Sequence, residues 1–180
     1  MGVVYAGEHR DTGRRVAIKC LFPHVAANEE QVARLFREAK IAATVEHSNV
    51  VEVFDGGRDG ETHFLVMEHL VGQTLSEYLE RGSTAIETVV GIFAQIMSGV
   101  AAVHDMGVVH RDLKPDNVFL ERDASDPMGP GVAKVLDFGV SKLRTPGREL
   151  TRLGTVTGTP YYMAPEQVAD TRSVDQRADV

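Results

Sequence analysis

The first third of the chain alternates apolar and polar positions in a way that predicts short strands. Residues 15–21 read Arg-Val-Ala-Ile-Lys-Cys-Leu, and this period of two is typical of a strand. A turn signal, Asp-Thr-Gly at 11–13, precedes it, so we expect 3–9 and 15–21 to form a hairpin. Two more strands are expected over 50–55 and 62–68. The turn between them is expected at the small and polar residues Gly56, Gly57, Asp59 and Gly60.

Apolar residues at helical spacing mark two longer segments. The first helix is predicted over 28–45, where Asn28 followed by two glutamates suits a helix start. The second is predicted over 87–104, after a short helix at 75–79. The apolar stripe of the first helix comprises Val32, Leu35, Phe36, Ala39 and Ala42. That of the second comprises Val89, Phe93, Ile96, Met97, Val100 and Val103.

The order of these elements predicts an α+β protein with two lobes of different class. Strands and one helix occupy the chain up to residue 68, and helices with short hairpin strands follow from residue 73. A hinge is expected over 69–72, and clefts between lobes are common ligand sites. The short apolar segments of the second lobe are 108–109, 118–120 and 135–136, with polar loops between them.

Composition and charge exclude several classes of protein. With 43% hydrophobic and 25% charged residues among 180, the chain is expected to fold rather than to stay disordered. The net charge of −7 argues against nucleic acid as a partner. We expect no membrane-spanning segment, because no apolar run looks long enough. Cys20 is the single cysteine, and no Cys/His cluster has zinc spacing, so neither an internal disulfide nor a zinc site is expected.

The loop 110–117 concentrates polar chemistry between two apolar segments. It reads His-Arg-Asp-Leu-Lys-Pro-Asp-Asn. Within it, Asp112 is able to accept a proton from a hydroxyl, Lys114 to neutralise a phosphate, and Asn117 to offer an amide oxygen to magnesium. Asp137 follows the apolar pair 135–136 and precedes a flexible glycine, which makes it a candidate second magnesium ligand.

These segments resemble the signature motifs of protein kinases. The loop 110–117 is similar to the HRDLxxxN catalytic loop, and Asp-Phe-Gly at 137–139 to the DFG motif. Val-Ala-Ile-Lys at 16–19 is similar to the VAIK of the third kinase strand, and Ala-Pro-Glu at 164–166 to the APE motif. The four motifs occur in the family's order. The resemblance implies a two-lobed kinase fold, with a small antiparallel sheet and one helix before a mainly helical C-terminal lobe.

The resemblance also implies roles for the polar residues. Lys19 would contact the α- and β-phosphates of ATP, with Glu38 at the position of its usual partner. Asp112 would be the catalytic base, with Lys114 beside it, while Asn117 and Asp137 would hold Mg²⁺ or Mn²⁺. His110 would be structural, packing under Phe138, and Asp179 would brace the catalytic loop. The residues that would line the ATP site are Gly2, Val4, Ala17, Lys19, Met67, Glu68, Leu70, Phe119 and Asp137.

Two features resemble the serine/threonine kinases in particular. Lys114 lies two places after Asp112, and the run from Gly158 to Glu166 is similar to their substrate-docking segment, with Thr159 positioned to hydrogen-bond Asp112. Arg111 precedes Asp112, an arrangement that in this family accompanies activation by phosphorylation. The candidate phosphorylation sites are Thr151, Thr155 and Thr157.

The resemblance leaves parts of the kinase pattern uncovered. Gly2 matches the third glycine of the glycine-rich loop and Val4 its valine, and the first two glycines have no counterpart. We therefore expect a partial kinase domain, with an N-lobe at 1–68, a hinge at 69–72 and part of a C-lobe at 73–180. On this view the complete protein is an active kinase and a piece limited to these residues is not. Residues 1–5 and the run Pro-Glu-Gln at 165–167 resemble bacterial members of the family.

Three functions remain open at this point. The leading one is ATP-dependent phosphorylation of protein substrates, and of the protein itself, by a cytoplasmic catalytic domain. The resemblance leaves open whether the full-length protein is anchored in a membrane. A pseudokinase that acts as a binding scaffold is a second, although Lys19, Asp112 and Asp137 are all intact. A small-molecule phosphotransferase of the same fold is a third, although such enzymes lack the docking segment that ends at Glu166.

Overall fold

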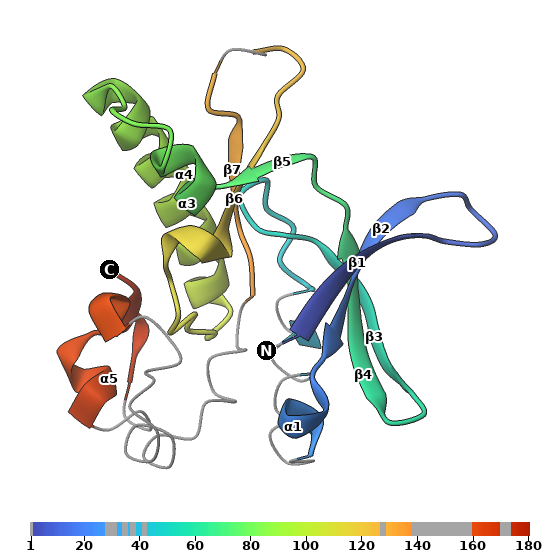
Figure 1. Cartoon of the computed structure of the whole chain (residues 1–180). Helices are drawn as coiled ribbons and strands as arrows, with labels where there is room; N and C mark the ends of the chain where they lie inside the picture. The colour runs from blue at the N-terminus through green and yellow to red at the C-terminus, as the bar shows by residue number, and fades with distance from the viewer. Residues whose placement is uncertain are drawn as a thin grey trace.

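The predicted strands at 15–21 and 62–68 form the centre of a four-stranded antiparallel sheet in a computed structural model of the chain (Figure 1). The sheet has the order β1-β2-β4-β3. Its strands are β1 (Gly2–Glu8), β2 (Arg15–Leu21), β3 (Val53–Asp59) and β4 (Thr62–Glu68). The structure describes residues 2–27, 32–33, 36, 39–40, 43–126, 129–137, 160–169 and 174–180.

The first hairpin is confirmed, and the second differs from its prediction. β1 and β2 pair antiparallel, with Gly2 opposite Leu21. β3 begins three residues later than expected and continues through Gly56 and Gly57, which were predicted to turn. The turn occurs at Gly60, whose φ is +56°.

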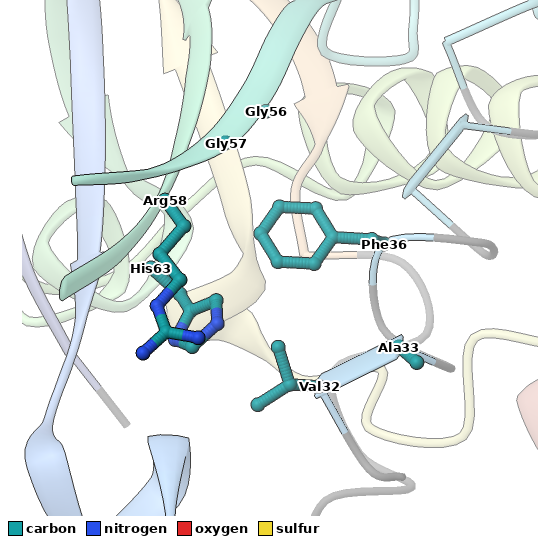
Figure 2. A pocket seen from close by; sticks show the side chains of 7 residues that line it. All are labelled: Val32, Ala33, Phe36, Gly56, Gly57, Arg58 and His63. Atoms are coloured by element: carbon teal, nitrogen blue, oxygen red, sulfur yellow. The ribbon is translucent and has the colours of Figure 1, made fainter. Parts of the chain in front are cut away.

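Close packing explains the glycines inside β3. A Cβ at Gly56 would lie 2.8 Å from Leu65 Cδ2 and 2.9 Å from Phe36 Cε1, so only a glycine lets Phe36 lie against the strand. Figure 2 shows Phe36 beside Gly56 and Gly57, at a cavity of about 370 Å³. The cavity is lined by Val32, Ala33, Phe36, Gly56, Gly57, Arg58 and His63.

The helix predicted over 28–45 is described only in part. Its described residues 32–33, 36 and 39–40 are helical, and 43–44 form a turn. Val32 and Ala39 from its predicted apolar stripe are buried. A short helix, α1 (Pro23–Ala26), comes before it and was not predicted; a proline in its first turn supplies a suitable backbone angle.

The C-terminal part places a small sheet beside two helices. The sheet has the antiparallel order β5-β6-β7, and β7 packs against the long helix α4. The short helix α3 starts with a capping box, in which Thr74 and Glu77 satisfy each other's backbone N–H groups. These elements are β5 (Gly72–Thr74), α3 (Leu75–Leu79), α4 (Ile86–Asp105), β6 (Val118–Glu121) and β7 (Val132–Val135).

Helix α4 contributes several buried residues to the core, and its buried stripe is slightly rotated from the predicted apolar stripe. Its buried residues include Ile92, Ile96, Val100 and Val103, whereas Phe93 is 57% exposed. By length and composition alone α4 is apolar enough to cross a membrane, contrary to the expectation that no such run exists. Because its buried stripe packs into the same cluster as Val118, Leu120 and Val135, we interpret it as a core helix.

Short helical elements complete the described chain. One of them, η1, ends the loop that carries the candidate chemistry, while α5 and η4 each carry a side chain that contacts this loop. In Figure 1 the C-terminus lies beside α5. These elements are η1 (Pro115–Asn117), η3 (Pro160–Tyr162), α5 (Pro165–Ala169) and η4 (Gln176–Asp179).

The N-terminal sheet is joined to the C-terminal part by a buried polar contact as well as by the chain. The Asn49 side-chain amide donates to the carbonyl oxygen of Ala133 at 2.8 Å and to Gln95 Oε1 at 3.2 Å. Val50 forms a parallel bridge with Val135. Gly99 on α4 permits this approach, since a Cβ there would lie 2.5 Å from the Asn49 carbonyl oxygen. The segment before β3 is thereby fixed to α4 and β7.

Candidate active site

The loop 110–117 is held between two buried valines, Val108 and Val118, and folds back on itself through Asn117. The Asn117 amide nitrogen donates to the Asp112 carbonyl oxygen at 2.7 Å and to Asp112 Oδ2 at 3.1 Å. Lys114 Nζ lies 3.5 Å from the same Oδ2. The loop therefore brings together a carboxylate, an ammonium group and an amide. Because the nitrogen of Asn117 is engaged, its oxygen is the atom that is able to meet a cation.

Lys19 and Asp137 are in direct contact, although one lies in β2 and the other follows β7. Lys19 Nζ pairs with Asp137 Oδ2, and the two side chains are 8% and 24% exposed. Asp137 adopts a φ of +62°, a conformation that is uncommon outside glycine and frequent at functional sites. Two of the predicted site residues thus meet directly.

His110 connects the loop to the residues that precede Asp137. It is fully buried; its Nε2 hydrogen-bonds the Leu136 carbonyl oxygen at 2.7 Å, and its Nδ1 accepts from the Asp112 N–H at 3.2 Å. This pattern assigns a neutral ring with its proton on Nε2. Burial lowers the pKa of His110, against the opposing effects of the Leu136 carbonyl and of the carboxylates of Asp179, Asp137 and Asp112.

Asp179 fixes the start of the loop. Its carboxylate accepts from the backbone N–H of His110 at 2.7 Å and of Arg111 at 2.6 Å. It also pairs with Nε2 of His104 at 2.8 Å, and only 4% of Asp179 is exposed. Arg111 has a φ of +66°, so these bonds stabilise an unusual backbone conformation. The bracing contact expected of Asp179 is confirmed.

The segment that follows the Ala-Pro-Glu motif also contacts the loop. Gln167 in α5 donates from Nε2 to the Arg111 carbonyl oxygen at 2.7 Å. Arg111 Nη2 donates to the Val174 carbonyl oxygen at 3.2 Å, while its buried Nε has no partner among the residues that the structure describes. Gln167 was not singled out from the sequence, where a single polar residue after the motif gives no signal.

One face of the N-terminal sheet collects several residues of the predicted nucleotide site. The register places Val4 opposite Lys19, and Ala17 opposite both Ala6 and Met67. Directly paired residues, and residues two apart on one strand, share a face of an antiparallel sheet. Val4, Ala17, Lys19 and Met67 therefore lie on one side. Lys19 is buried although lysine is seldom buried unless it is paired.

The remaining predicted nucleotide residues lie around the connection between the two sheets. Glu68 ends β4, and Leu70 belongs to the short connection that leads to β5. Phe119 in β6 lies opposite Thr74 in β5. Gly2 begins β1.

Several predicted residues lie outside the described part of the chain. They are Glu38, Phe138, Thr151, Thr155, Thr157 and Thr159.

Two polar contacts near the site were not predicted from the sequence. One is the Asn49 contact to Ala133, and the other is an ion pair of 2.7 Å between Lys134 Nζ and Glu68 Oε1. Asn49 and Lys134 belong to none of the kinase motifs, and Glu68 was predicted only as a residue that lines the ATP site. A charged residue in a short strand is equally compatible with solvent exposure. The ion pair depends on how the two sheets are positioned relative to each other, which a local sequence pattern does not show.

Comparisons with known proteins agree with this geometry. The chain matches the protein kinase domain family over residues 1–180. It is 42% identical over 181 residues to the serine/threonine-protein kinase Pkn1 of Myxococcus xanthus, covering 100% of this chain and 25% of that protein. It is 37% identical over 178 residues to the serine/threonine-protein kinase PknL of Mycobacterium tuberculosis, covering 98% of this chain and 42% of that protein.

A solved structure has the same fold. The crystal structure of the Mycobacterium tuberculosis PknI kinase domain aligns with a TM-score of 0.76 and 25% sequence identity, covering 99% of this chain and 64% of that one. The chain thus spans about a quarter to two fifths of the two curated relatives, and about two thirds of the solved domain. The expected two-lobed α+β architecture is confirmed.

Proposed function

The chain belongs to the protein kinase domain family, and on that premise we propose that it transfers the γ-phosphate of ATP to serine or threonine hydroxyls of proteins. One observation carries the proposal: the loop 110–117, with Asp112 and Asn117, lies together with Lys19 of β2 and with Asp137 after β7. Asn117 bonds Asp112, Lys19 bonds Asp137, and the Leu136 N–H donates to the Asn117 carbonyl oxygen at 2.8 Å. Phosphoryl transfer needs positioning and charge neutralisation, and this set provides groups for both.

In this proposal Asp112 is the catalytic base. Its carboxylate is about one-fifth exposed, so a substrate hydroxyl is able to reach it. The Asn117 amide and the Lys114 ammonium both lie beside Oδ2 and orient the carboxylate. Lys114 also brings a positive charge to the place where the transferred phosphate is negatively charged.

The metal site that the family implies fits the residues present. Among the described residues no group of three or more His, Cys, Asp or Glu side chains is arranged to hold a metal by itself. Magnesium commonly takes one or two protein ligands together with the phosphates of its substrate. The Asn117 amide oxygen and the Asp137 carboxylate match that requirement, and manganese would suit the same oxygens. The bound ion neutralises phosphate charge.

The nucleotide would lie between the sheet face and the small sheet. Val4, Ala17 and Phe119 supply apolar surface for an adenine ring, with Met67 at its back. The Glu68 N–H already donates to the Glu52 carbonyl oxygen at 2.9 Å, so the Glu68 carbonyl is its backbone group suited to an adenine amino group. Leu70 would offer the second backbone contact, and Gly2 would lie near the phosphates.

Arg111 supports a proposal about regulation. Its buried Nε lacks a partner among the described residues, and a charged donor left in this way favours an anionic ligand. We propose that phosphate on Thr151, Thr155 or Thr157 pairs with Arg111, and that Thr159 contacts Asp112. Phosphopeptide mapping tests this: an active enzyme with all three threonines unmodified contradicts it.

The proposal includes the setting of the reaction. The domain would act in the cytoplasm on protein substrates and on its own chain. Its proposed parts are the N-lobe at 1–68, the hinge at 69–72 and the partial C-lobe at 73–180. A phosphate-transfer assay that compares residues 1–180 with the full-length protein tests whether these residues suffice for activity. We expect activity in the full-length protein alone.

The deciding experiment is transfer of labelled phosphate from ATP to a generic protein substrate by the full-length protein. The Asp112→Asn variant keeps an acceptor oxygen for Asn117 and loses the base, so we expect transfer to fall by about two to four orders of magnitude. ATP binding should persist in the variant. Binding without any transfer in the wild type would instead support a scaffold, and transfer only to a small molecule would support a phosphotransferase of that class.

A further inference from the structure

An ion pair joins the end of the N-terminal sheet to the small sheet of the C-terminal part. Lys134 Nζ in β7 lies 2.7 Å from Glu68 Oε1 at the end of β4. The two side chains are 13% and 18% exposed, so the pair is far less hydrated than an ordinary surface ion pair. Pairs held in such surroundings are screened little by salt.

The carboxylate of Glu68 has a fixed position. The same Oε1 accepts from the Glu52 N–H at 2.8 Å, and the Glu68 N–H donates back to the Glu52 carbonyl oxygen at 2.9 Å. Both the side chain and the backbone of Glu68 are thus bound to one residue before β3. Lys134 is therefore attached to a rigid point of the N-terminal sheet and not to a mobile side chain.

Lys134 is itself close to the chemistry. It lies three residues before Asp137, in a strand whose end is bound to the Asn49 carbonyl oxygen through the Val135 N–H at 2.9 Å. Leu136, between them, accepts from His110. A displacement of Lys134 along the strand would therefore be transmitted to Asp137.

We propose that Glu68 and Lys134 are positioning residues that set the separation between the hinge and Asp137, and thereby the affinity for ATP. This inference rests on the proposed function, in which the adenine meets the Glu68 backbone and the phosphates meet Lys19 and Asp137. A nucleotide that spans these two points binds best when their spacing is fixed beforehand, because less ordering is then needed on binding. Lys134 touches none of the reacting groups, so its effect falls on binding.

The test uses the full-length protein with Lys134→Met. We expect the KM for ATP, and the Kd of a non-hydrolysable ATP analogue, to rise about five- to tenfold, while kcat changes less than about twofold. Lys134→Arg keeps the charge and should restore both constants to within about twofold of wild type. Glu68→Gln keeps an acceptor for the Glu52 N–H and removes the ion pair, so it should raise the KM as well, even if Lys134→Met folds poorly.

Glu121 provides a matched control. Its Oε2 lies 3.9 Å from the same Lys134 Nζ, and its side chain is more exposed than that of Glu68. Glu121→Gln should therefore leave the KM for ATP within about twofold of wild type. An equal effect of Glu121→Gln, an unchanged KM in Lys134→Met, or a rise in kcat at constant KM would overturn the inference. A wild-type protein that binds no nucleotide would overturn the proposed function too. If the wild type binds ATP and the variants keep its KM for ATP, only the positioning role of Glu68 and Lys134 is rejected.

Discussion

The ammonium group of Lys19 touches the carboxylate of Asp137, although the two residues are 118 positions apart in the sequence. Lys19 reaches this point because β2 lies inside the four-stranded sheet, and Asp137 because it leaves β7 with a positive φ. The contact therefore requires that both parts of the molecule have folded and docked. A positive and a negative group of the proposed phosphate site are assembled together.

Removing the ammonium group should disable transfer. Lys19→Met keeps the length and apolar stem of the side chain and leaves Asp137 without this cation, so we expect kcat/KM for ATP-dependent transfer to fall about a hundredfold or more. Labelled-phosphate assays on the full-length protein measure this. Circular dichroism of the variant controls for folding. Activity within about threefold of wild type would show that Lys19 is not part of the site.

Asp179 should matter more for stability than its distance from the reacting groups implies. In Asp179→Asn an amide NH₂ replaces one of the two buried carboxylate oxygens, of which Oδ2 accepts from the His110 N–H and Oδ1 from the Arg111 N–H. We expect the free energy of unfolding to fall by about 2–4 kcal/mol, measured by urea denaturation. Asp175→Asn is the matched control, because that carboxylate is exposed and pairs with a neighbouring arginine. Equal effects of the two variants would contradict the bracing role.

Two glycines of α4 should respond in opposite ways to alanine. A Cβ at Gly99 would lie 2.5 Å from the Asn49 carbonyl oxygen, so Gly99→Ala should lower the free energy of unfolding by about 1–3 kcal/mol. Nothing lies within 4 Å of a Cβ at Gly91, so Gly91→Ala should raise it by about 0.5–1 kcal/mol through helix propensity. Thermal melts of both variants check the signs. The same sign for both would mean that Asn49 does not approach α4 as described.

The burial of His110 predicts how stability depends on pH. Its pKa is lowered in the folded chain, so below about pH 6.5 the unfolded chain binds a proton that the folded chain does not. The contribution of His110 is therefore complete above that pH and is lost as the pH falls towards its lowered pKa. Nitrogen NMR of the ring should show Nε2 protonated and Nδ1 unprotonated at about pH 6.5, where an ordinary histidine is half protonated. A ring that gains its second proton near pH 6.5 in the folded protein contradicts this.

Local patterns predicted the elements well where packing agrees with them. The strands at 15–21 and 62–68 match their predicted bounds, since both lie inside the sheet and pair with a strand on either side. Gly56 and Gly57 misled the prediction, because a glycine is compatible with a turn and with close packing alike. Phe93 fits the period of α4 but lies just outside the buried arc, which depends on where β7 lies.

The site was predictable as far as its residues lie in motifs. Asp112, Asn117, Lys19 and Asp137 were all named from the sequence, and the structure brings them together in two bonded pairs. The pair formed by Glu68 and Lys134 was out of reach, because it depends on how one sheet is placed against another. No local pattern encodes that placement.

Helix α4 has a consequence for synthesis in the cell. A chain leaves the ribosome from its N-terminus, and β7, which packs against α4, ends about 30 residues after the helix does. Until those residues emerge, a segment apolar enough to enter a lipid bilayer has its natural cover missing. During synthesis the apolar stripe of α4 is therefore without its β7 partner until the β6–β7 hairpin has emerged, so this part of the core closes late.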